Sequence, residues 1–85
     1  RAFIERRRNA ELDGIITAEG LRPDETRAVV ERAFRDGGLP TTGTAITAIL
    51  PPTSRFTPAG EHSARKQRVL AALRAFFDRF AILSS

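Results

Sequence analysis

The most constraining feature of the sequence is a run of large apolar residues near its end. They follow one another at intervals of four, three, one and three positions: Val69, Leu73, Phe76, Phe77 and Phe80. At about 3.6 residues per turn, these intervals place all of them on one side of an α-helix. The sequence therefore predicts a helix from about Glu61 to Leu83, about 34 Å long at a rise of 1.5 Å per residue. Its apolar side must be covered by the rest of the chain.

The material for that cover is limited, because the chain has 85 residues and no cysteine. A chain of this length forms one small domain, residues 1–85, and apolar burial must stabilise it without disulfides. Phenylalanine is the only aromatic residue type, at six positions: Phe3, Phe34, Phe56, Phe76, Phe77 and Phe80. We expect most of these rings to be buried in a single core.

Two helices are predicted in the first half of the chain. Apolar residues at helical spacing indicate a helix from Phe3 to about Glu19, and Gly20 is typical of the position that ends one. Pro23 favours the first turn of a second helix, which Asp36, Gly37 and Gly38 would end. The connection between the two is short, so we expect a helical hairpin.

The segment from Thr41 to Leu50 fits two structures. Its β-branched residues permit a strand, but Ile46, Ile49 and Leu50 follow helical spacing, and Thr42 or Thr44 could cap a short helix. We favour the short helix, which Pro51 and Pro52 would end.

Residues 51–60 are rich in Pro, Gly and Thr and contain one large apolar residue, Phe56. A lone phenylalanine in a polar loop either packs back into its own core or is presented to a partner, and we favour the first. The predicted fold is thus all-α: a small bundle of three main helices plus one short helix, with a Pro/Gly/Thr-rich loop before the long C-terminal helix.

The sequence contains few residues that are suited to catalysis. His62 is the only imidazole and there is no thiol, so His62 is a poor candidate for activating a nucleophile and a zinc site lacks ligands. Asp24 and Glu25 fit a structural position in the first turn of a helix, and the turn around Gly43 lacks the lysine of a phosphate-binding loop. We predict no catalytic residues, no metal and no cofactor in this chain.

Binding is the remaining class of function. The formal net charge is +4, and acidic residues interleave with the arginines, which is typical of helix surfaces with ion pairs. Two places could bind a partner: the basic start of the last helix (Arg65, Lys66 and Arg68) and the loop that carries Arg55 and Phe56. Arginine beside apolar groups suits both protein interfaces and phosphate contacts, so the sequence leaves the kind of partner open.

No apolar stretch is long enough for a signal peptide or a membrane span, and the absence of cysteine is compatible with the cytosol. We expect a cytoplasmic fragment of a larger protein that does not contact a membrane.

Two stretches resemble a known family. TTGTAITAILPPTSRF (residues 41–56) and KQRVLAALRAFFDRF (residues 66–80) are similar to the C-terminal end of the R subunit, the motor and nuclease subunit of type I restriction enzymes. The resemblance implies a parent protein that translocates and cleaves DNA using ATP and magnesium, in a cytoplasmic bacterial complex. The nuclease and ATPase motifs of that parent are not in this chain.

The resemblance also implies a partner. In this family the C-terminal region is thought to attach the motor to the methyltransferase core, which consists of modification and specificity subunits. We expect such a docking role. Two alternatives stay open: a module that binds the DNA backbone without reading bases, and a helical cap that packs on its own subunit.

Overall fold

The computed structural model describes residues 2–51 and 59–84, and for residues 59, 62 and 81–84 it describes the backbone alone. These residues form four α-helices and no strand: α1 (Ala2–Glu19), α2 (Pro23–Asp36), α3 (Gly43–Ile49) and α4 (Ala59–Ser84). The predicted all-α fold with three main helices and one short helix is confirmed. Arg55 and Phe56 lie outside the described residues, so the placement of Phe56 stays a prediction.

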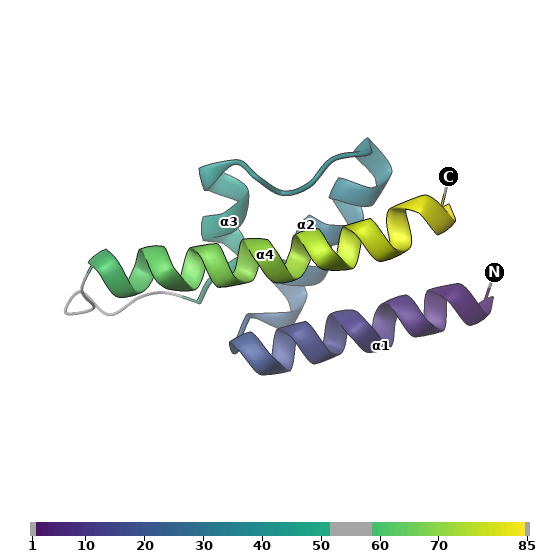
Figure 1. The fold of residues 1–85 in the computed structure, drawn as a ribbon, viewed down its shortest axis with the longest axis horizontal. Coiled ribbons are helices and arrows are strands. Elements are labelled where there is room, and N and C mark those ends of the chain that lie inside the picture. The colour runs from purple at the N-terminus through teal and green to yellow at the C-terminus, as the bar shows by residue number, and fades with distance from the viewer. Residues whose placement is uncertain (1, 52–58, 85) are drawn as a thin grey trace.

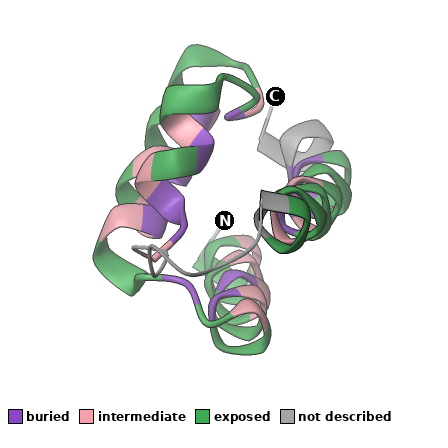
Figure 2. Ribbon diagram, turned by 90° about the vertical axis from the view of Figure 1, so that its left-hand side faces the viewer, coloured by how far each residue is buried: buried purple, intermediate pink, exposed green. Residues whose placement is uncertain are grey.

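The helices form two layers. α1 and α4 lie side by side and run in opposite directions, so that the start of α1 and the end of α4 are at the same end of the molecule (Figure 1). α2 and α3 pack on each other in the second layer (Figure 2). With 26 residues, α4 is about 39 Å long. It therefore runs along most of the longest dimension, 45 Å, as predicted.

The turns at both ends of α2 follow the sequence signals. Gly20 has φ of 63°, and the N–H of Leu21 donates to the carbonyl of Ile16 at 3.0 Å, which closes the end of α1. Pro23 occupies the first turn of α2, and Gly37, with φ of 78°, ends that helix. The short connection is confirmed, but α2 crosses α1 steeply and does not run back along it as a hairpin (Figure 1).

The short helix α3 also forms as predicted. The Thr42 hydroxyl accepts a hydrogen bond from the N–H of Ala45 at 3.2 Å, so Thr42 is the cap and Thr44 is not. Leu50 is extended, with ψ of 140°, because the residue before a proline avoids the helical region.

One core joins all four helices. The five apolar residues of the predicted face of α4 are 0–6% exposed. They pack against buried residues of the other helices and turns: Leu12, Ile16, Leu21, Val30, Ala33, Ile46, Ile49 and Leu50. The sequence interpretation of α4 is therefore confirmed.

Aromatic rings connect the two layers. Phe34 of α2 stacks on Phe77 of α4, with ring centroids 4.3 Å apart, and meets Phe76 edge-on at 5.6 Å. Phe80 lies 5.3 Å from Phe76. Through Phe34, α2 contacts α4, and it also contacts α1. The helix α2 therefore packs across both helices of the α1–α4 pair.

Phe3 differs from the expectation of a buried ring, since 67% of it is exposed. The core-facing stripe of α1 runs through Ile4, Leu12 and Ile16. Phe3 lies one residue before that stripe, about 100° around the helix, and so points away from the core.

We predict that Phe76→Ala lowers the free energy of unfolding by about 3–5 kcal/mol, because a fully buried ring leaves a cavity. Urea denaturation measures this loss. Phe3→Ala is the matched control and should change the free energy by less than about 0.5 kcal/mol. Equal effects of the two substitutions would contradict the assignment of the core.

The burial of the Thr26 side chain leads to a second prediction about stability. It is fully buried in α2, and its hydroxyl oxygen has no hydrogen-bond partner among the described residues. Thr26→Val, which exchanges the hydroxyl for a methyl group, should leave the unfolding free energy unchanged or raise it by about 1–2 kcal/mol. Thr26→Ser keeps the hydroxyl but loses the methyl group, and should lower it by about 1 kcal/mol. Destabilisation by valine would show that the hydroxyl is bonded in solution.

Candidate functional site

The basic start of α4 contacts the end of α1. The Arg65 guanidinium donates through Nη2 to the carbonyl oxygens of Glu19 and Gly20, the second at 3.2 Å. The last carbonyls of a helix lack partners within the helix and carry partial negative charge, so a cation is favourable there. Arg65 thus caps α1 from a different helix.

Gly20 lies directly beside this guanidinium. Its φ of +63° disfavours any residue with a side chain, and a Cβ atom at this position would lie 3.4 Å from Nη2 of Arg65. The same glycine therefore ends α1 through its backbone conformation and offers its carbonyl oxygen to Arg65.

Arg68 strengthens the same junction. Its Nε lies 3.4 Å from Oε2 of Glu19, whose side chain is 19% exposed. Lys66 is half-buried and has no carboxylate partner within the described part of the chain. Of the residues predicted to bind a partner, Arg65 and Arg68 therefore have intramolecular partners, and Arg55 and Phe56 are outside the described residues. A role of these residues in partner binding stays a prediction.

Ion pairs between helices recur along the molecule. Arg8 pairs with Glu31 at 3.4 Å, and further pairs join Arg27 to Asp13 and Arg79 to Glu11. The sequence suggested pairs within a helix, and one of that kind is present, Arg32 with Asp36 at 3.7 Å. The pairs between helices depend on how the helices cross, so spacing along one helix could not reveal them. Each contributes little on an exposed surface, about 0–1 kcal/mol.

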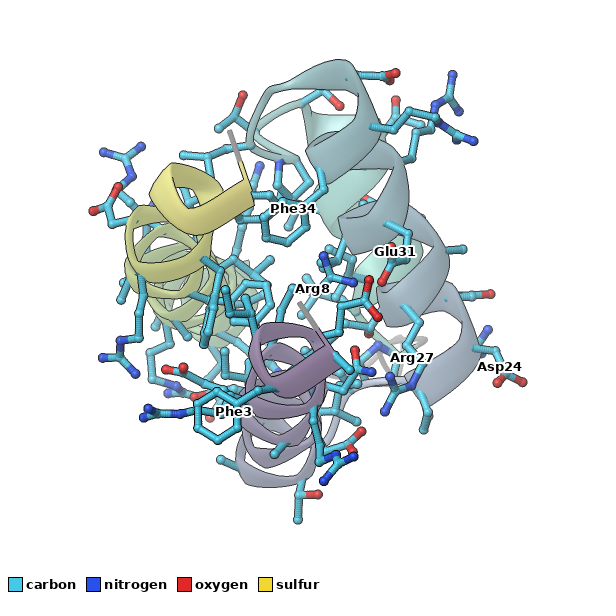
Figure 3. The ribbon with its side chains drawn as sticks, turned by 90° about the vertical axis from the view of Figure 1, so that its right-hand side faces the viewer. Phe3, Arg8, Asp24, Arg27, Glu31 and Phe34 are labelled. Carbon is cyan, nitrogen blue, oxygen red and sulfur yellow. The ribbon has the colours of Figure 1, made fainter. Side chains whose placement is uncertain are left out.

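Arg8 is the least exposed of these arginines. Its side chain is 18% exposed, and its guanidinium carbon lies 5.1 Å from the centroid of the Phe34 ring (Figure 3). Arg8 stands four residues from both Ile4 and Leu12, in the core-facing stripe of α1. An arginine in an apolar stripe is a signal visible in the sequence, because a guanidinium that lies partly in the core needs an aromatic ring or a carboxylate beside it.

An open groove of about 470 Å³ lies between α2 and α3. Its walls come from the second half of α2, the turn after it and α3: Val29, Arg32, Ala33, Asp36, Gly38, Leu39, Pro40, Thr42, Thr44, Ala45 and Ala48. Arg32 and Asp36 neutralise each other on its rim, and its walls are mostly small and apolar. The groove offers space for apolar groups and carries no pair of free titratable groups within the described residues.

Asp24 and Glu25 lie in the first turn of α2, as predicted, and Glu25 pairs with Arg22 at 3.1 Å. Among the side chains that the structure describes, which do not include that of His62, no three of His, Cys, Asp or Glu gather as a metal site would require. Among the described helices, none combines the length and the apolar character of a membrane span.

We predict that Arg65→Ala lowers the free energy of unfolding by about 1 kcal/mol, because two carbonyls at the end of α1 lose a charged donor. Arg65→Lys should recover part of the loss, since a single ammonium replaces the planar fork. The control is Arg74→Ala, an exposed arginine of α4 without a carboxylate partner among the described residues. A shift in the urea midpoint no larger than that of Arg74→Ala would contradict the capping role.

The comparisons with known proteins agree with the resemblance seen in the sequence. No curated protein and no solved structure matches the chain significantly. A family model does match residues 1–80, and its description is "Type I restriction and modification enzyme - subunit R C terminal". The match includes α1 and α2, which the resemblance did not cover. Because it spans nearly the whole chain, this protein belongs to the family of C-terminal regions of type I restriction enzyme R subunits.

Proposed function

We propose that this chain is a non-catalytic docking module, which attaches the R subunit to the methyltransferase core formed by modification and specificity subunits. The observation that carries the proposal is the family match over residues 1–80, because an R subunit is one component of an enzyme with several subunits. A region at its C-terminal end is a natural place for contact with the others.

The ion pairs within the chain support a binding function over a catalytic one. Six of the ten acidic residues form ion pairs with arginines of the same chain: Glu11, Asp13, Glu19, Glu25, Glu31 and Asp36. Four of these pairs join different helices, and the other two lie at the start of α2 or within it, so these carboxylates are engaged in structural contacts. ATP and magnesium, which the resemblance implies for the parent, would be held by other parts of the R subunit.

The architecture suits a rigid docking surface. α1 and α4 are held together at one end by Arg65 and Arg68, and nearer the other end by Arg79. The aromatic rings fix α2 against them. A surface that is ordered before binding loses little conformational entropy on association, so a modest contact area is sufficient for specific binding.

The test removes residues 1–85 from the R subunit and measures its affinity for the purified methyltransferase core by calorimetric titration. We expect the dissociation constant to rise by at least about tenfold, equivalent to roughly 1.4 kcal/mol. Thermal unfolding of the shortened subunit serves as the control for its integrity.

An unchanged affinity for the core would contradict the proposal. If the deletion weakened only the binding to DNA, the DNA-backbone alternative would replace it. That binding should fall steeply with salt, with a log-log slope of about −0.9 for each phosphate contact.

A further inference from the structure

The start of α1 carries an exposed aromatic ring. Phe3 is 67% exposed and is the only large hydrophobic residue exposed in the described part of the chain. The guanidinium carbon of Arg7 lies 5.9 Å from the centroid of this ring, so a cation flanks an apolar surface. Every other described phenylalanine contacts another ring.

The neighbouring arginines are free to bind a partner. Arg6 and Arg7 are exposed, and neither pairs with a carboxylate within the described residues. Arg8, the next residue, differs because it is committed to Glu31 and Phe34. Residues three and four apart share one side of a helix, so Phe3, Arg6 and Arg7 form one patch, which we term the Phe3 patch.

From this arrangement we infer that the Phe3 patch binds an acidic protein surface on the methyltransferase core. The inference rests on the proposed function and assigns its contact. Two guanidinium groups without a carboxylate partner favour carboxylates on the partner protein. The exposed ring favours an apolar pocket beside those carboxylates. Arginine and aromatic residues together are typical of the positions that dominate the affinity of protein interfaces.

The position of the patch fits this role. It lies at the opposite end of α1 from the Arg65 cap at Glu19 and Gly20, so a partner can cover it without disturbing that junction. The start of α1 lies at one end of the elongated molecule (Figure 1).

A DNA backbone fits the patch less well. Other exposed arginines without a described carboxylate partner, Arg35 and Arg74, lie on different helices and do not extend the patch along α1. A row of cations that could follow successive phosphates is therefore missing from the described part of α1.

The test uses the complete R subunit with Phe3→Ala, or with Arg6→Glu and Arg7→Glu together, and titrates each against the purified methyltransferase core. We expect each variant to bind roughly tenfold more weakly or worse. The charge-reversed variant should also lose most of the salt dependence of its association rate. The matched control reverses two exposed arginines elsewhere, Arg35→Glu on α2 together with Arg74→Glu on α4, and should bind within about twofold of the unmodified subunit.

The outcomes separate this inference from the proposed function. If deletion of residues 1–85 weakens core binding but the Phe3 patch variants bind normally, the inference is wrong and the docking function stands. If neither the deletion nor the Phe3 patch variants weaken core binding, the inference and the proposed function are both wrong. A lower melting temperature of the R subunit with normal core binding would place the patch inside the subunit, and a loss confined to DNA binding would make it a DNA surface. Either result would overturn the inference.

Discussion

The packing of the phenylalanine side of α4 is the interaction on which the rest of this structure depends. The side chains of Phe76, Phe77 and Phe80 are at most 6% exposed, and Phe34 of α2 packs on the first two. A chain this small, without disulfides, has few other sources of stability. The long helix α4 therefore provides the central packing surface. The positions of the other helices are set by their contacts with α4 or with one another.

Much of the fold follows from local rules that the sequence displays. Gly20, Gly37 and Thr42 mark helix ends by chemistry that acts within one turn, and α4 follows from the spacing of its apolar residues. The crossing of α2 over α1 and the ion pairs between helices could not be predicted in this way, because they depend on tertiary geometry. Arg65 illustrates the difference: its position on a helix was evident, but its partners are carbonyls more than forty residues away along the chain.

The basic residues divide into two groups with different consequences for function. Arg8, Arg65 and Arg68 lie against rings, carbonyls or carboxylates of the same chain and stabilise the arrangement of the helices. Arg7 lies over an exposed ring, and neither Arg6 nor Arg7 pairs with a carboxylate within the described residues. Charge counted over the whole sequence hides this division, which is why the start of α4 was the more conspicuous candidate and the start of α1 was missed.

Hydrogen exchange of the complete R subunit, measured with and without the methyltransferase core, tests the central claim most directly. The claim is that a rigid frame built on α4 presents the start of α1 to a partner. It predicts that the amides of residues 69–80 exchange slowest in both states, and that the core adds protection at residues 2–8. Fast exchange along α4, or added protection confined to other parts of the chain, would contradict it.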